Sequence, residues 1–304
     1  MESRCEKNKQ QQESIEEEEK REKRKKIAKI IFIVLILLFL LFSTCYFYIT
    51  YIATKRLIVK EKVVTSEKIP DSFQGLKIIQ FSDIHYGSTF SLADLKEVVG
   101  EINKRNPDLV FFTGDLIDSD YELKTDEAEK IMKELKKIHV TIGKYAVSGE
   151  EDIESFQTIM NQSDFSILTN DYDLVYRNDN HPILLVGLGS LSVNQDIDHA
   201  FRYFKEDNHN SNIYTIALFH EPDSISSIKS NYSVDLGLAG HSHNGEVRLP
   251  FIGGLSRVEG AMDYHDSFYE FDNTKLYISS GLGSSYYHMR LFNRPSISFF
   301  RLRK

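Results

Sequence analysis

An uncharged run near the N-terminus constrains this chain more than any other feature. No charged residue occurs from Ile30 to Thr54, and every residue from Ile30 to Phe42 is apolar. About 20 apolar residues cross a bilayer as an α-helix, so the run is long enough to span a membrane. The far end carries amphipathic rings, which favour the membrane interface, at Tyr46, Tyr48 and Tyr51. We predict a transmembrane anchor over residues 30–54.

The residues on either side of this run predict how the chain is divided. Residues 1–29 contain a Gln run and blocks of like charge, which cannot bury apolar surface, so we expect a disordered cytoplasmic tail. A cleaved signal peptide is the alternative, but the long charged lead and the lack of a clear small-x-small cleavage site argue against it. Seven basic residues precede the run closely and five follow it. This bias predicts a single-pass protein of the cell membrane, with residues 57–304 outside the cytoplasm.

The charge of the chain is unevenly distributed. Residues 1–56 hold 12 of the 37 Lys and Arg residues and 8 of the 45 Asp and Glu residues, a net charge of +4, which leaves −12 for the remainder. Binding to nucleic-acid backbones needs a basic surface, so we expect no nucleic-acid partner. A phosphorylated substrate remains compatible with an acidic domain, because bound metal ions can supply local positive charge. Both cysteines, Cys5 and Cys45, precede residue 57 and do not settle the compartment.

Beyond the anchor, short apolar runs alternate with amphipathic segments. Helices are expected from Ser91, which has capping-box spacing with Asp94, towards Arg105, and over residues 126–138. This alternation is typical of a layered α/β domain. The expected strands cover residues 76–81, 109–113, 145–148, 183–188, 214–219, 235–238 and 276–279.

Residues that can bind metals follow these strands directly. In α/β sheets, ligands bind beyond the carboxyl ends of the strands. Taken singly, each motif also occurs as an ordinary turn, but together they place two carboxylates and four histidines at one edge, a nitrogen and oxygen donor set suited to manganese, iron or zinc. A carboxylate at Asp115 could bridge two ions that clamp a phosphoryl group. The six residues are Asp83, His85, Asp115, His220, His241 and His243.

In this order, the motifs resemble the five sequence blocks of the calcineurin-like metallophosphoesterase family over roughly residues 75–300. Residues 240–250 (GHSHNGEVRLP), 280–283 (SGLG) and 290–295 (RLFNRP) are similar to its membrane-associated bacterial YkuE/YaeI-like branch. The resemblance implies a sandwich of two mixed β-sheets flanked by helices, and a dinuclear metal centre. It implies that Asp83, His85, Asp115 and His243 hold one metal ion. Asp115 would bridge to the second ion, which His220 and His241 also bind.

The third block departs from the family pattern. The family has Gly-Asn-His-Asp or Gly-Asn-His-Glu where this chain has Gly149-Glu150-Glu151-Asp152. Glu150 stands where the family has an Asn ligand to the second metal, and its charge favours hard metals such as manganese or magnesium. We expect two divalent ions, with manganese before iron or zinc. Glu151 stands where the family has a His near the substrate. An ionised Glu151 would repel a phosphate, whereas a protonated one could act as an acid.

These observations predict a membrane-anchored, metal-dependent phosphoesterase, of phosphodiesterase type, that hydrolyses a phosphorylated envelope or lipid-linked substrate by attack of metal-bound hydroxide. We expect catalytic roles for Glu151, Asp115 and His241, and phosphate contacts from Arg248 and Arg290, although both arginines could equally form salt bridges. The alternative is a weakly active or non-catalytic metal platform that binds a phosphorylated ligand, since the loss of a positioned acid costs about 10² to 10⁴ in rate.

Overall fold

One long helix contains most of the uncharged run. In the computed structural model, which describes residues 4–87, 89–152, 154–206, 212–284 and 288–304, helix α1 (Arg4–Phe47) is followed by a π-helix, η1 (Tyr48–Ile52). By length and composition this segment could cross a membrane. The helix includes residues 4–29, for which we expected disorder. Glu–Lys pairs at helical spacing, Glu16 with Lys20 and Glu22 with Lys25, favour helix there. The domain limits at residues 30, 54 and 57 stay predictions.

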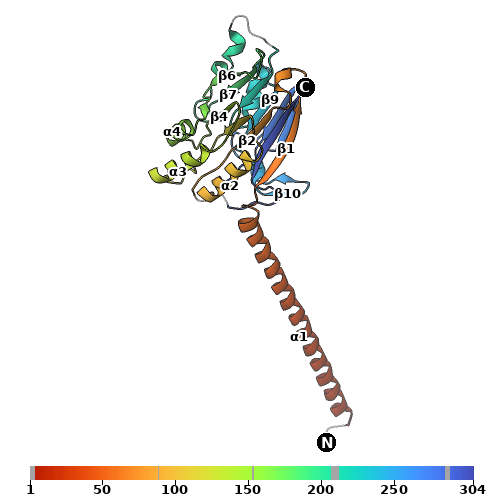
Figure 1. Ribbon diagram of the computed structural model, residues 1–304. Coiled ribbons are helices and arrows are strands. Elements are labelled where there is room, and N and C mark those ends of the chain that lie inside the picture. The colour runs from red at the N-terminus through yellow and green to blue at the C-terminus, as the bar shows by residue number, and fades with distance from the viewer. Residues whose placement is uncertain (1–3, 88, 153, 207–211, 285–287) are drawn as a thin grey trace. The chain divides into compact units, whose positions relative to one another are not determined.

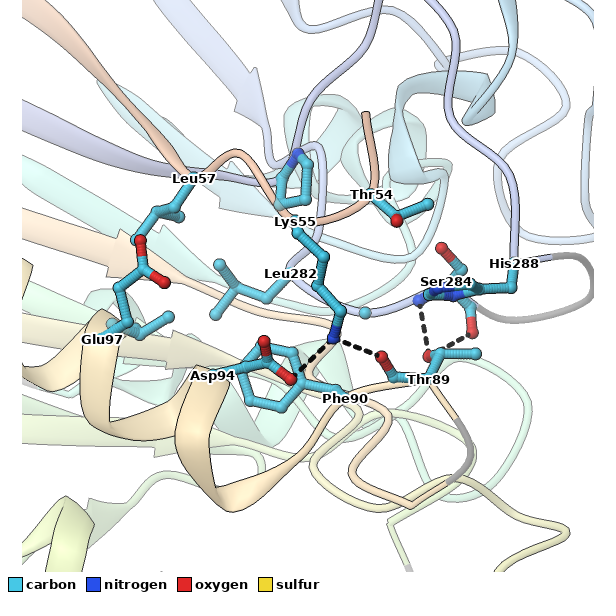
Figure 2. A pocket seen from close by; sticks show the side chains of 13 residues that line it. Thr54, Lys55, Leu57, Thr89, Phe90, Asp94, Glu97, Leu282, Ser284 and His288 are labelled. Carbon is cyan, nitrogen blue, oxygen red and sulfur yellow. Dashed lines mark hydrogen bonds and ion pairs between the residues drawn. The ribbon is translucent and has the colours of Figure 1, made fainter. Parts of the chain in front are cut away.

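The chain divides into two compact units, Met1–Ile49 and Thr50–Lys304. In the larger unit, the residues that follow η1 pack against its loops. Lys55 Nζ lies 2.8 Å from Asp94 Oδ2 and donates to the Thr89 carbonyl, as Figure 2 shows. The Ile58 N–H donates to the Pro295 carbonyl at 2.9 Å. The beginning of the larger unit is therefore bonded to the chain near its C-terminus.

Two six-stranded mixed sheets form the centre of the larger unit (Figure 1). The first has the order β1-β14-β2-β3-β4-β5, and the second has the order β12-β13-β9-β8-β7-β6. The first sheet contains β1 (Ile58–Thr65), β14 (Ser296–Arg303), β2 (Lys77–Phe81), β3 (Leu109–Thr113), β4 (Gly143–Val147) and β5 (Ser166–Ile167). The second contains β12 (Phe268–Phe271), β13 (Thr274–Ile278), β9 (Leu236–Ala239), β8 (Thr215–Leu218), β7 (Ile183–Gly187) and β6 (Asp171–Val175).

The helices cover the outer faces of these sheets. The first sheet is covered by α2 (Leu92–Asn103), α3 (Thr125–Leu135) and α4 (Glu154–Gln162). The second is covered by α5 (Ile197–Ala200), the 3₁₀-helix η3 (Arg202–Lys205) and α6 (Ser224–Asn231). The remaining elements are η2 (Asp71–Phe73), η4 (His243–Gly245) and a small hairpin of β10 (Arg248–Leu249) and β11 (Gly253–Gly254).

Strand periodicity builds this sandwich. In β2, Ile79 and Phe81 pack with the helices of the first sheet, whereas Ile78 packs into the core between the two sheets. Successive side chains of a strand point to opposite faces, so an all-apolar strand such as Leu109–Thr113 fits a sheet buried on both faces. The predicted α/β sandwich of two mixed sheets flanked by helices is confirmed. So is the capping box of Ser91 and Asp94 at the start of α2.

Candidate metal centre

The carboxyl ends of five strands deliver the predicted ligands. Asp83 and His85 follow β2, and Asp115 and Glu150 follow β3 and β4. In the other sheet, His220 follows β8, while His241 and His243 follow β9. Strands β2, β3 and β4 are parallel neighbours, as are β8 and β9, so their carboxyl ends meet at one edge of each sheet.

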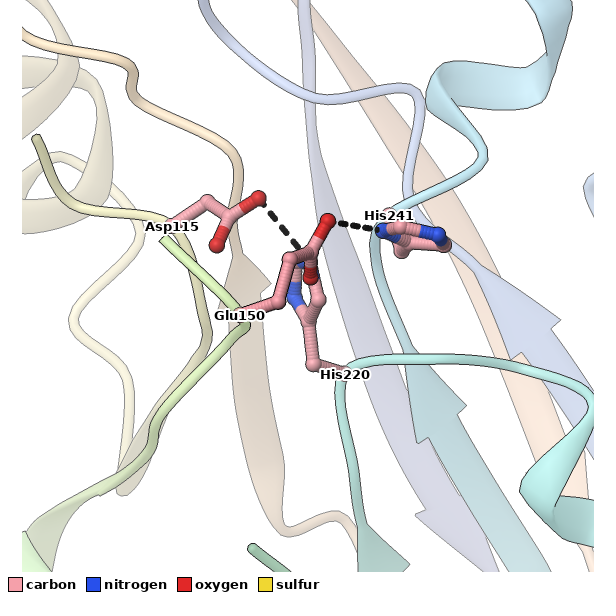
Figure 3. A group of neighbouring side chains, drawn as sticks. All are labelled: Asp115, Glu150, His220 and His241. Atoms are coloured by element: carbon pink, nitrogen blue, oxygen red, sulfur yellow. Dashed lines mark ion pairs between the residues drawn. The ribbon is translucent and has the colours of Figure 1, made fainter. Parts of the chain in front are cut away.

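One group of ligand atoms gathers around His220 (Figure 3). His220 Nε2 lies 3.0 Å from Asp115 Oδ2 and 3.1 Å from Glu150 Oε2. The other oxygen of Glu150 lies 2.8 Å from His241 Nδ1. All four ligand atoms lie within 4.8 Å of one another. Glu150 therefore lies close enough to Asp115, His220 and His241 to share a metal ion with them.

A second group lies beside the first and contains Asp83, His85 and His243. His85 Nε2 and His243 Nε2 are 3.0 Å apart, and His243 Nε2 is 3.5 Å from Asp83 Oδ1. Asp115 connects the two groups, because its Oδ2 atom also lies 3.8 Å from His85 Nε2. The structure therefore brings together all seven predicted ligands around a shared carboxylate, while their role as ligands stays a prediction.

The hydrogen bonds of His220 and His241 fit a metal ion within the first of these groups. His220 Nδ1 donates to the Thr113 carbonyl at 2.7 Å, and His241 Nε2 donates to the Glu259 carbonyl at 2.6 Å. In a neutral imidazole the other ring nitrogen then carries a lone pair, and both of these nitrogens face carboxylate oxygens. Electron-pair donors at such distances repel one another unless they share a cation. A nitrogen and oxygen donor set of this kind suits divalent transition metals.

Most of the candidate ligands have strained backbone conformations. Asp83, His85, Asp115, His241 and His243 all have φ between 44° and 66°, a region that residues other than glycine rarely adopt. Such outliers cost roughly 1–3 kcal/mol each and occur where the surrounding structure imposes them. The turn of Asp115 also needs Gly114, which has φ 93° and where a Cβ would lie 2.2 Å from His220 Nδ1.

Acidic side chains surround the ligands and orient them. Glu151 accepts a hydrogen bond from His85 Nδ1 at 3.1 Å, which turns Nε2 of His85 towards the centre. Glu246 Oε1 lies 3.2 Å from His243 Nδ1. Carboxylates in this position commonly fix the tautomer of metal-binding histidines. The predicted catalytic role of Glu151 stays a prediction, and the geometry gives this side chain a positioning contact.

Asp152 is a site residue that the sequence reasoning missed. Its carboxylate accepts hydrogen bonds from the backbone N–H groups of Asp115, Leu116 and Gly149, at 2.8–2.9 Å. It thereby ties the turn after β3 to the turn after β4. The only signal in the sequence was its place in the third block, after the two glutamates.

Burial and charge shift the pKa values of these groups. Burial lowers the pKa of His85, but the hydrogen bond to Glu151 and the charge of Asp115 outweigh it and raise the pKa to about 9. Burial and the charge of Asp115 raise the pKa of Asp152 to about 7. Burial opposes ionisation of Glu150, yet the histidines beside it hold its pKa well below the usual range. The centre therefore stabilises positive charge strongly.

Both arginines that we predicted to contact phosphate are bonded to other groups of the protein. Arg290 is fully buried and donates to the Ser280 carbonyl at 2.7 Å and to the Gly283 carbonyl at 2.6 Å. Arg248 lies 2.7 Å from Asp266 and donates to the Asn244 carbonyl at 2.9 Å. Two nitrogens of the Arg290 guanidinium are thus bonded to buried carbonyls, which gives Arg290 a structural role, and the predicted phosphate contacts of both arginines stay predictions.

Comparisons with known proteins agree with this centre. The calcineurin-like phosphoesterase family model matches residues 76–245. The chain is 31% identical over 264 residues to the uncharacterized metallophosphoesterase YkuE of Bacillus subtilis (strain 168), covering 85% of this chain and 90% of that protein.

Two further relatives are more distant. A Danio rerio transmembrane protein with metallophosphoesterase domain is 26% identical, covering 76% of this chain and 54% of that protein. The UDP-2,3-diacylglucosamine pyrophosphatase LpxG of Chlamydia muridarum (strain MoPn / Nigg) is 26% identical, covering 77% of this chain and 86% of that protein. With the family match over more than half of its length, the chain belongs to the calcineurin-like phosphoesterase family and is a metal-dependent phosphoric ester hydrolase.

Proposed function

We propose that this protein is a membrane-anchored phosphoesterase, of phosphodiesterase type, that acts on a lipid-linked or envelope phosphate outside the cytoplasm. The observation that carries the hydrolase part is the pair of ligand groups joined by Asp115. The N-terminal helix, long and apolar enough to span a membrane, supports the anchor. The excess of basic residues before it supports an N-terminus in the cytoplasm.

Each residue around the centre has a task in this proposal. Asp83, His85, Asp115 and His243 would hold one divalent ion, and Asp115, Glu150, His220 and His241 would hold the other. When bound, two such ions polarise phosphoryl oxygens and supply hydroxide at neutral pH. Glu151 and Asp152 keep His85 and Asp115 in place through their hydrogen bonds. Glu150 adds a third carboxylate to the donor set, which favours manganese.

The relatives support the class of substrate. LpxG is named as a pyrophosphatase of UDP-2,3-diacylglucosamine, a phosphorylated molecule with acyl chains. The Danio rerio relative is named as a transmembrane protein. An apolar helix in this chain would hold its metal centre near substrates of similar chemistry, which remain in or at a membrane.

The test is hydrolysis of bis-p-nitrophenyl phosphate, beside its monoester, by the full chain in detergent after reloading with manganese, iron or zinc. We expect metal-dependent turnover with preference for the diester, highest with manganese. Asp115→Asn removes one negative charge from the shared ligand and should abolish turnover. Metal binding without turnover of either ester would contradict the proposal and favour the alternative prediction, a metal platform that binds a phosphorylated ligand without cleaving it.

A further inference from the structure

Four large apolar side chains stand in solvent beside the metal centre. We call Phe251, Ile252, Leu255 and Phe292 the apolar finger. Their exposed fractions are 109%, 71%, 56% and 72%. The first three belong to the hairpin of β10 and β11, and Phe292 lies next to it because Leu291 bridges Val247. A cluster of exposed apolar side chains of this size marks an interaction site.

The backbone holds the two phenylalanines in unfavourable conformations. Phe251 has φ 68° and Phe292 has φ 52°, a region in which bulky residues are genuine outliers. Neither ring gains burial in return, because both side chains point into solvent. Strain of this kind persists where the surrounding structure imposes it, and it is concentrated at functional sites. The backbone conformation at Phe251 and Phe292 therefore holds both rings out in solvent.

The finger lies close to the residues that follow the apolar helix. The Ile58 N–H donates to the Pro295 carbonyl, and Pro295 lies only three positions after Phe292. At about 3.6 Å per residue, this separation is at most roughly 11 Å. Thr54, Lys55 and Leu57 also line one pocket together with His288 and Pro295 (Figure 2). If Thr54 ends a membrane span, covalent connection keeps this end of the larger unit at the membrane surface.

The base of the finger is bonded to a candidate metal ligand. Asn293 Nδ2 donates to the His243 carbonyl at 2.7 Å, and the Leu291 N–H donates to the Glu246 carbonyl at 3.3 Å. The carboxylate of Glu246 in turn lies 3.2 Å from His243 Nδ1. The metal centre and the finger therefore lie at the same end of the unit. A surface that covers the finger therefore lies at the end of the unit that carries the metal centre.

We propose that the apolar finger inserts into the lipid bilayer and holds the metal centre against the lipid headgroups. This proposal rests on the membrane anchor of the proposed function and narrows its substrate to phosphates at the bilayer surface. Two exposed basic residues, Arg56 shortly after the apolar helix and Arg257 two residues after Leu255, fit anionic headgroups. Apolar rings flanked by basic side chains are typical of segments that lie in the membrane interface.

The chain contains no tryptophan, so a single introduced tryptophan reports on its own surroundings. The experiment uses the full chain, reconstituted with manganese in phosphatidylglycerol–phosphatidylcholine vesicles whose acyl chains are brominated. Phe251→Trp and Phe292→Trp are each compared with Tyr176→Trp. Tyr176 is 53% exposed and follows Val175, which pairs with the first residue of β7, at the end of the sheet opposite to the metal centre.

We expect blue-shifted emission from both finger tryptophans and at least twofold stronger bromine quenching than at Tyr176→Trp. Water-like emission, with quenching equal to that of Tyr176→Trp, would overturn the proposal. Ile252→Trp gives a second reading if a phenylalanine variant does not fold. Each measurement is repeated in the Asp115→Asn background, where quenching should persist without turnover. Failure of membrane insertion is thereby separated from failure of the proposed hydrolysis.

Discussion

In a Glu151→Ala variant, His85 would lose the carboxylate that accepts its Nδ1–H at 3.1 Å, and the Ser119 N–H would lose the same acceptor at 3.0 Å. His85 could then rotate away from the ligand group that it shares with Asp83 and His243. Removal of such a carboxylate commonly costs 10- to 100-fold in metal affinity, or about 1.4–2.7 kcal/mol. In Glu151→Gln, an amide oxygen can still accept both hydrogen bonds, so we expect a loss of about tenfold or less.

The affinity is measured by titrating the full chain with Mn²⁺ and following the EPR signal of the free ion. Turnover of bis-p-nitrophenyl phosphate is measured in parallel at saturating metal. Glu129→Ala, which removes an exposed carboxylate of α3, is the matched control. If Glu151 positions His85, excess metal should restore most of the turnover. Unchanged manganese affinity, with a loss of about 10² to 10⁴ in turnover at saturating metal, would refute this reasoning and make Glu151 the proton donor.

Three further predictions concern charge. Glu150→Asn removes one negative charge from the group around His220 and should weaken binding of the second manganese ion by about tenfold or more, measured by the same titration. Arg290→Met leaves two buried carbonyls without their donor and should lower the free energy of unfolding by about 2–5 kcal/mol, measured by thermal melting against Arg257→Met. Burial, with the charges of Arg290, Lys62 and Arg248, lowers the pKa of Lys60 from 10.5 to about 8. The folded protein then binds fewer protons than the unfolded chain between these values, so stability should rise from pH 8 to 10.5, and Lys60→Met should flatten that rise in thermal melts.

Local patterns made much of the fold predictable. The strand Leu109–Thr113 has the expected bounds, because a run of five apolar or β-branched residues between turn signals is typical of a buried strand and too short for a helix. The capping box of Ser91 and Asp94 is likewise visible within four residues. The predicted ligands lie in short motifs directly after strands, so their convergence follows once those strands are parallel neighbours.

Long-range contacts explain what the sequence did not reveal. Strands β1 and β14 were missed because each is defined by its pairing with the other, across more than 200 residues. The burial of Arg290 depends on how the connection between β13 and β14 folds back on itself, which brings the Ser280 and Gly283 carbonyls to the guanidinium, and no local pattern predicts that path. The partner of Glu151 could not be assigned either, because His85 lies 66 residues earlier in the chain.

The position of β14 determines when the larger unit can fold during synthesis. This strand lies between β1 and β2, paired in parallel with one and antiparallel with the other. The first sheet is therefore incomplete until the ribosome has made the chain as far as Arg303. The apolar helix leaves the ribosome much earlier. When it enters the membrane during translation, the larger unit is therefore still unfolded. A ribosome that stops before Ser296 releases a product whose β1 has no partner strand, which exposes it to proteolysis.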